Sequence, residues 1–174
     1  MKIVFLDAKT IGDDIDLSGF DKIGEVIKDD ISTTDQASER TNDADVVIVN
    51  KVQINEKSIG EAKNLKLVCV TATGTNNLDK DYLDKRNIEW RNVAGYSTET
   101  VAQHTFALAF YLFEKLSYYD DYVKSEKYVN DISFTHFDRA FHELNGKTWG
   151  IIGLGNIGRR VAGIAKAFGC NVIY

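Results

Sequence analysis

Four short apolar runs, rich in β-branched residues, alternate with segments of helical composition in the first part of the chain. The runs are 2–8, 44–50, 65–70 and 88–93, and each has the length of a β-strand. Such alternation predicts βα units that build a parallel sheet with helices over both faces. A weaker strand is expected at 25–28, between the first two runs. The sequence therefore predicts an α/β fold.

Polar or glycine-containing segments follow three of the predicted strands. Asn50 and Lys51 come after the second run, 71–77 after the third and 94–97 after the fourth. Open α/β sheets bind their ligands at the carboxyl ends of the strands. We therefore expect a binding site at this edge of the sheet.

A long helix is predicted from Thr98 to about Leu116. Ser97 is a suitable N-cap, and the charge of Glu99 in the first turn suits the helix dipole. Because apolar residues cover so much of the circumference, we expect this helix to be buried between two domains or two subunits. One apolar stripe holds Val101, Thr105, Leu108, Leu112 and Leu116, and a second holds Ala102, Phe106, Ala109 and Phe113. We place a domain boundary at the start of this helix, which divides the chain into 1–97 and 98–174.

The stretch 118–144 combines aromatic side chains with many charges and has no clean helical period. Two interpretations have equal support: a loop packed on its own core, or an arm that contacts a second subunit or closes over a site. Neither His136 nor His142 has a partner that the sequence identifies. The aromatic residues are Tyr118, Tyr119, Tyr122, Tyr128, Phe134, Phe137 and Phe141.

A glycine motif follows a predicted strand directly. The strand covers 148–152, the motif Gly-Leu-Gly-Asn-Ile-Gly covers 153–158, and a helical pattern continues to Phe168 and ends at Gly169. A second strand is predicted at 170–174. A GxGxxG motif that lies between a strand and a helix, within a βαβ unit, is typical of dinucleotide-binding sites.

Each glycine of the motif has a physical task. Gly153 permits the tight turn, Gly155 lets the backbone approach a pyrophosphate, and Gly158 lets the helix pack closely on the strand. The N–H groups near Asn156 and Ile157, with the helix dipole behind them, are expected to bind the phosphates. The alternative is a glycine-rich turn in a generic α/β protein.

Charge and apolar content exclude several partner classes. A net charge of −5 gives no basic footprint for nucleic acid or anionic membranes. No apolar run approaches the ~20 residues of a membrane span, and the N-terminus lacks the apolar core of a secretory signal. Cys69 and Cys170 show neither metal-ligand spacing nor a disulfide framework, so we expect buried free thiols in a cytoplasmic protein.

Five ordered segments resemble the D-isomer-specific 2-hydroxyacid dehydrogenases, and most closely the glycerate dehydrogenases, also called hydroxypyruvate reductases. The resemblance covers essentially the whole chain. It implies that 1–97 form a flavodoxin-like substrate domain. It further implies that 98–174 comprise a linking helix, an aromatic arm and the first βαβ portion of a Rossmann NAD-binding domain. The segments are 44–51, 71–79, 92–98, 101–108 and 144–158.

The resemblance implies hydride transfer between a nicotinamide cofactor and a small 2-keto acid such as hydroxypyruvate or glyoxylate. NAD is the expected cofactor, and NADP stays open because the residue that selects between them is expected at about the end of the chain. The alternative is a non-catalytic, dinucleotide-sensing regulatory protein of the same fold. A third possibility is that 1–174 act as an isolated domain that pairs with another chain.

For the first domain, the resemblance implies that Thr73 and Gly74 contact the substrate carboxylate and the cofactor in an interdomain cleft, partly through backbone N–H groups. Amides at a strand end can form such an anion-binding concavity. The alternative for this pair is a simple turn. Lys51 is either a surface lysine or a cation near the acidic substrate.

For the long helix, the resemblance implies that Val101 and Thr105 line the nicotinamide side of that cleft, although residues on such an apolar face more often belong simply to a core. His104 invites an acid/base role. In this family, however, the catalytic histidine lies far downstream, so we expect His104 to serve packing or hydrogen bonding.

The resemblance also implies an arginine that holds the carboxylate and a Glu–His pair that supplies the proton. All three are expected after residue 174. We therefore expect an N-terminal portion of a longer enzyme, with no catalytic residue in this chain and no activity alone. The resemblance and the aromatic arm together suggest a homodimer.

Overall fold

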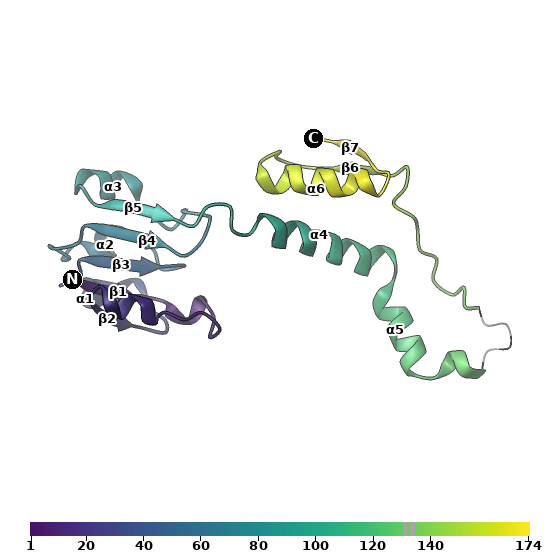
Figure 1. The fold of residues 1–174 in the computed structure, drawn as a ribbon, viewed down its shortest axis with the longest axis horizontal. Coiled ribbons are helices and arrows are strands. Elements are labelled where there is room, and N and C mark those ends of the chain that lie inside the picture. Colours follow the sequence, from purple (N-terminus) through teal and green to yellow (C-terminus); the bar gives the residue numbers. More distant parts are fainter. Residues whose placement is uncertain (131, 133–134) are drawn as a thin grey trace. The chain divides into compact units, whose positions relative to one another are not determined.

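A computed structural model of the chain describes residues 1–130, 132 and 135–174 (Figure 1). These residues form two compact units, Met1–Ala94 and Gly95–Tyr174. No helix in the described part of the chain is long and apolar enough to cross a membrane.

The first unit is built on a five-stranded parallel sheet with the strand order β2-β1-β3-β4-β5. Its register pairs Ile3 with both Val26 and Val46, and Val47 with Val68. The predicted α/β fold and all five predicted strands of this unit are confirmed. The three central strands are rich in Val and Ile, which favour strands that are buried on both faces. The strands are β1 (Lys2–Phe5), β2 (Glu25–Lys28), β3 (Val46–Val49), β4 (Leu67–Val70) and β5 (Glu89–Asn92).

The two faces of this sheet are covered differently. Alternate strand residues such as Val4, Val47 and Val68 pack into a large core with residues of the three α-helices. On the opposite face, Ile3, Phe5 and Ile48 pack against 3-10 turns rather than α-helices. The prediction that helices cover both faces of the sheet is therefore only partly correct. The α-helices are α1 (Thr34–Thr41), α2 (Glu56–Ile59) and α3 (Lys80–Lys85), and the 3-10 helices are η1 (Ala8–Thr10) and η2 (Ser18–Lys22).

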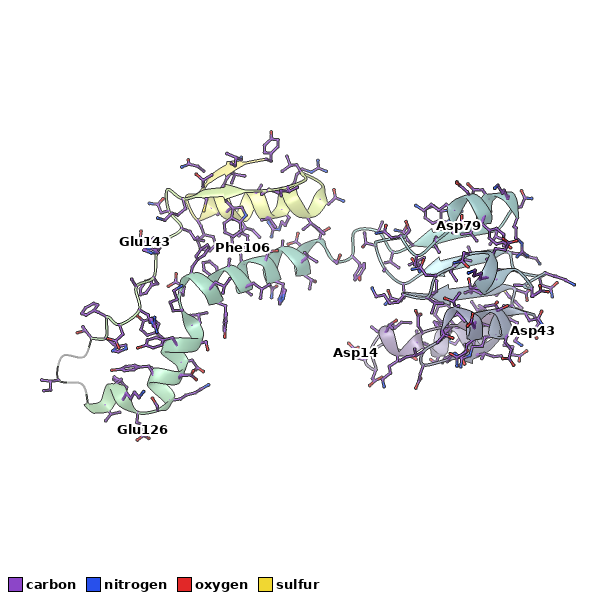
Figure 2. All side chains as sticks on the ribbon, turned by 180° about the vertical axis from the view of Figure 1, so that it is seen from behind. Asp14, Asp43, Asp79, Phe106, Glu126 and Glu143 are labelled. Carbon is purple, nitrogen blue, oxygen red and sulfur yellow. The ribbon has the colours of Figure 1, made fainter. Side chains whose placement is uncertain are left out.

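The second unit joins a parallel β-pair to two packed helices. Strands β6 (Thr148–Gly150) and β7 (Asn171–Ile173) pair in parallel, and α6 (Asn156–Ala167) connects them. Helix α4 (Thr98–Phe113) packs on α6. Figure 2 shows Phe106 pointing from α4 toward α6, and its ring stacks on Trp149 with centroids 4.7 Å apart. This strand–helix–strand unit confirms the predicted context of the glycine motif.

Helix α4 begins at Thr98, as predicted, but differs from the prediction at its C-terminal end, in its N-cap hydrogen bond and on one face. It ends at Phe113 instead of Leu116, because Lys115 adopts a left-handed conformation with φ of 54°. The Ser97 side chain makes no cap hydrogen bond. Only the stripe with Ala102 and Phe106 enters the core, whereas the face with Leu112 is exposed.

The aromatic stretch contains a helix that the sequence analysis missed. Helix α5 (Leu116–Lys124) is followed by the short 3-10 helix η3 (Lys127–Asn130). The His136 ring stacks on Tyr122 with centroids 3.7 Å apart, and its Nε2 lies 2.7 Å from the Tyr118 hydroxyl. Phe134 lies outside the described residues. These contacts, with Phe141 against Tyr119, show that part of the stretch packs on itself.

The two cysteines are free thiols, as predicted. Cys170 is buried, whereas Cys69 on β4 is only partly buried. Burial raises the pKa of the Cys69 thiol, and the nearby Arg91 guanidinium opposes that rise.

Candidate functional site

Asp7 organises the carboxyl edge of the first sheet. It follows β1, is 4% exposed, and accepts hydrogen bonds from three successive backbone N–H groups of the loop after β3. Its Oδ1 lies 2.8 Å from the nitrogen of Asn50, and its Oδ2 lies 2.6 Å and 3.2 Å from the nitrogens of Lys51 and Val52. The backbone of the loop that carries Lys51 is therefore held in place by the buried side chain of Asp7.

The loop after β3 is joined to the loop after β4. The Asn77 side-chain amide, buried like Asp7, donates a hydrogen bond to the Val52 carbonyl at 3.1 Å. Ile54 and Leu78 form a parallel β-bridge, in which the Ile54 N–H bonds to Asn77 and the Asp79 N–H bonds to Ile54. The two loops therefore form one continuous wall.

Thr73 is anchored from the other side, by the end of β5. Its hydroxyl donates to the Val93 carbonyl at 3.1 Å, and its own carbonyl accepts from the Asn92 side-chain amide at 2.7 Å. The Val93 N–H also bonds to Ala72. These contacts hold Thr73 in place, and its N–H makes no hydrogen bond to any residue that the structure describes.

A cleft of about 300 Å³ lies between the two loops. The structure brings Lys51 and Gly74 together on its wall, as the prediction of a site at this edge requires. Among the described residues, no hydrogen bond or ion pair uses the Lys51 ammonium or the N–H groups of residues 73–75. The cleft thus offers one cation and unpaired amides to an anionic ligand. The lining residues are Asn50, Lys51, Gln53, Ala72, Gly74, Asn76 and Asn77.

The glycine motif forms a second candidate site, in the second unit. Gly153 turns the chain after β6 with φ of +92°, and Gly155 is the N-cap of α6. A β-carbon at Gly158 would overlap the Gly153 carbonyl oxygen, whereas one at Gly155 would meet no atom within 4 Å. Close packing at one glycine and open space at another match the tasks expected of them.

Asn156 and Ile157 begin α6, so their N–H groups lie in the first turn, where an α-helix leaves backbone donors without helical partners. Arg159 donates from Nη2 to the Asn156 side chain at 3.1 Å. Arg160 bonds through Nε to Glu99 of α4 at 2.7 Å. The positive end of the helix dipole and a guanidinium therefore lie near the glycine turn.

The candidate residues on α4, which are Val101, His104 and Thr105, have environments that do not by themselves indicate a function. Val101 is 40% exposed and Thr105 is partly buried, its hydroxyl bonded to the Val101 carbonyl at 2.8 Å. His104 is exposed, with no hydrogen bond or ion pair to any described residue. The roles of Val101 and Thr105 stay predictions.

Asp7 and Asn77 are the residues of this edge that sequence analysis missed. The available signal was an acid placed directly after an apolar strand. Its partners lie 43 to 45 positions away along the chain, and the spacing of residues does not identify such contacts.

Comparison with known proteins identifies the relatives of this arrangement. Residues 4–164 match the family model described as D-isomer specific 2-hydroxyacid dehydrogenase, catalytic domain. The chain is 34% identical over 174 residues to a putative 2-hydroxyacid dehydrogenase of Haemophilus influenzae, covering 100% of this chain and 55% of that protein. It is 32% identical to a hydroxypyruvate reductase of Blautia hydrogenotrophica, covering 99% of this chain and 55% of the relative.

The fold of the chain is also similar to the folds of solved structures. A D-lactate dehydrogenase of Aquifex aeolicus, complexed with NAD and lactic acid, has a TM-score of 0.78 at 27% identity, covering 98% of this chain and 50% of the other. An acyclic imino acid reductase, in complex with NADPH and D-Arg, has a TM-score of 0.82 at 26% identity, covering 98% and 54%. The chain therefore spans about half the length of the relatives it matches.

Proposed function

The chain belongs to the D-isomer specific 2-hydroxyacid dehydrogenase family, and we propose that the whole protein reduces a small 2-keto acid to the D-2-hydroxy acid with a nicotinamide dinucleotide. Hydroxypyruvate and glyoxylate are the expected substrates, because relatives named hydroxypyruvate reductase and glyoxylate reductase are among its matches. The observation that carries the proposal is the glycine turn at the start of α6.

The residues of that turn suit a dinucleotide. Gly155 leaves open space in front of the helix N-terminus, and Gly158 permits the close packing that brings the turn there. Asn156 and Ile157 offer N–H donors to a pyrophosphate, with the helix dipole adding to the attraction. When bound, the cofactor supplies the hydride. We propose NAD as the cofactor, with NADP as the alternative, since solved relatives hold one or the other.

The cleft of the first unit is proposed to hold the acid. Amide N–H groups of Thr73 and Gly74 and the Lys51 ammonium would bind the substrate carboxylate, and no carboxylate lies among the residues that line this cleft. Thr73, Val101 and Thr105 are proposed to contact the cofactor. We assign no catalytic acid or base to residues 1–174.

We further propose that the protein is a cytoplasmic homodimer. The outer face of α4 and the start of α5 carry large apolar side chains that are about half exposed, which is typical of a surface that a second subunit buries. These residues and their exposed fractions are Leu108 54%, Tyr111 50%, Leu112 65%, Phe113 42% and Leu116 46%.

The test is oxidation of NADH and NADPH by the whole protein, followed at 340 nm with hydroxypyruvate, glyoxylate and pyruvate. Turnover with at least one keto acid is expected. Cofactor binding without turnover on any related keto acid would instead support a dinucleotide-sensing regulatory protein. Failure to bind either cofactor would overturn both functions.

A further inference from the structure

We propose that Asp7 is a positioning residue for the anion-binding cleft, and that it determines which loop receives the substrate carboxylate. This inference rests on the proposed function, because it concerns the same cleft. It goes further by giving Asp7 a role: its carboxylate occupies the neighbouring amides of residues 50–52, so that the substrate carboxylate is left with those of the loop after β4.

The exclusion follows from the donors that Asp7 occupies. Three successive N–H groups that converge on one point form a natural anion site. Here that point is occupied by the chain's own carboxylate, at 2.8 Å, 2.6 Å and 3.2 Å from the three nitrogens. An external carboxylate therefore cannot use the N–H groups of residues 50–52. What this loop still offers to the cleft are the side chains of Lys51 and Gln53.

The second loop has the opposite character. Among the described residues, no hydrogen bond uses the N–H groups of Thr73, Gly74 or Thr75. Gly74 also has no atom within 4 Å of the position of a β-carbon, so its backbone is accessible. A carboxylate in the cleft can therefore bond to these amides while it pairs with Lys51.

The carboxylate of Asp7 also sets the distance between the two loops. Residues 50–52 are held by Asp7, and Val52 is held in turn by Asn77, the residue that ends the second loop. Thr10 adds a further tie, since the Asn50 side chain donates to its hydroxyl at 3.0 Å. Releasing Asp7 would therefore move Lys51 relative to residues 73–75, although Asp7 is not among the residues that line the cleft.

Asp7→Asn is the direct test. The variant keeps the shape but replaces one carboxylate oxygen by an NH2 group, so at least one of the three amides of residues 50–52 loses its acceptor and faces a donor instead. Asp45→Asn is the matched control, because Asp45 also accepts a backbone N–H, from Lys2 at 2.7 Å, but at the opposite edge of the same sheet. In the whole protein, hydrogen exchange at residues 50–52 should rise roughly tenfold or more in Asp7→Asn and stay unchanged in Asp45→Asn.

A second variant tests the occupied site itself. Asp7→Ala should leave the three amides facing a small cavity, and added formate should restore their protection, because it replaces the missing carboxylate. Asp45→Ala should show no formate effect at residues 50–52. If neither variant changes exchange at these residues, or formate restores nothing, the assignment of Asp7 is wrong.

The wild-type protein supplies a test that needs no variant to fold. Oxamate, a non-reducible analogue of a 2-keto acid, should slow exchange at residues 73–75 in the presence of NADH and leave residues 50–52 unchanged. Protection at 50–52 instead would overturn the assignment of the loops.

Steady-state kinetics separate positioning from general stability. In Asp7→Asn, KM for the keto acid should rise roughly tenfold with a smaller change in kcat, while KM for NADH and all constants of Asp45→Asn stay near wild type. Equal effects of the two variants would mean that Asp7 is only structural. No turnover by the wild type would refute the proposed function, whereas the exchange experiments would still decide the role of Asp7.

Discussion

Gly158 of α6 lies so close to Gly153 that a β-carbon on the first would overlap the carbonyl oxygen of the second. The Gly153 carbonyl is a backbone group, so it cannot avoid the overlap by changing rotamer as a side chain can. The contact therefore fixes how near the helix begins to β6, and with it the position of the turn that we propose binds the cofactor.

Gly158→Ala should destabilise the second unit by about 1–3 kcal/mol, the usual cost of overpacking, and should abolish NADH binding. Gly163→Ala is the matched control, because it lies on the same helix with no atom within 4 Å of its β-carbon position. Alanine there should be neutral or stabilise by up to about 1 kcal/mol. Thermal unfolding and NADH fluorescence titration would measure both, and equal stability of the two variants would contradict the close contact.

Gly155→Ala should separate binding from folding. Its backbone, with φ of −72°, is accessible to alanine, and the added methyl group meets no protein atom within 4 Å. The melting temperature should stay within about 1 °C of wild type, while the Kd for NADH should rise roughly tenfold or more because the methyl occupies the space of the pyrophosphate. Unchanged affinity would refute the assignment of this space to the cofactor.

Phe106→Ala should remove the central side chain from the hydrophobic core of the second unit. Phe106 is 5% exposed and stacks on Trp149 at 4.7 Å and on Phe168 at 5.9 Å. We expect a loss of about 3–5 kcal/mol in unfolding free energy and a red shift of Trp149 fluorescence in a Trp90→Phe background. His104→Ala, on the exposed side of the same helix, should change neither measurement.

The Tyr118 hydroxyl should ionise at unusually high pH. Burial raises the pKa of Tyr118, and the Asp138 carboxylate, 3.2 Å away, adds to that rise, whereas Arg139 opposes it. Because the folded-state pKa lies above the unfolded value, Tyr118 stabilises the fold below pH ~10. That contribution is lost as the pH rises through the folded-state pKa.

Absorbance at 295 nm, taken as the difference between wild type and Tyr118→Phe, would follow this single titration. Asp138→Asn removes the negative charge and should lower the pKa of Tyr118, while burial still keeps it above the ordinary value. An unchanged titration in Asp138→Asn would show that the carboxylate has no influence.

Leu112→Glu should weaken the proposed homodimer roughly tenfold or more in Kd, because it places an unpaired charge in an apolar interface. Ile31→Glu is the control, since Ile31 is similarly exposed, at 64% against 65% for Leu112, but lies in the first unit. Sedimentation velocity of the whole protein would measure both. A monomeric wild type, or a dimer that tolerates Leu112→Glu, would refute this interface.

The sheet of the first unit was predictable because its chemistry is local. Runs such as 46–49 are apolar on both faces, and only a buried strand of a parallel sheet accommodates that pattern. The glycine turn was predictable for a related reason: the strand, the turn and the helix that define it are consecutive in sequence.

The errors arose where a conformation has no compositional mark or depends on distant residues. Nothing in the sequence signals that Lys115 is left-handed, a conformation that is uncommon outside glycine. Helix α5 did leave a signal, since Tyr118, Tyr119 and Tyr122 are spaced to share one helical face, but the many charges obscured it. The only signal for Asp7 was an acid after a strand, because its three partners belong to the loop after a different strand, β3, 43 to 45 positions away along the chain.

The bridge between Ile54 and Leu78 has a consequence for protein engineering. Because the loops after β3 and β4 are fastened to each other, neither can be lengthened or exchanged without shifting the other. Efforts to change the preferred acid by grafting a loop from a relative should therefore transplant 50–54 and 72–79 as a pair, together with the acid that follows β1. If only one loop were grafted, the other loop would not match it, and the grafted side chains would be misplaced in the cleft.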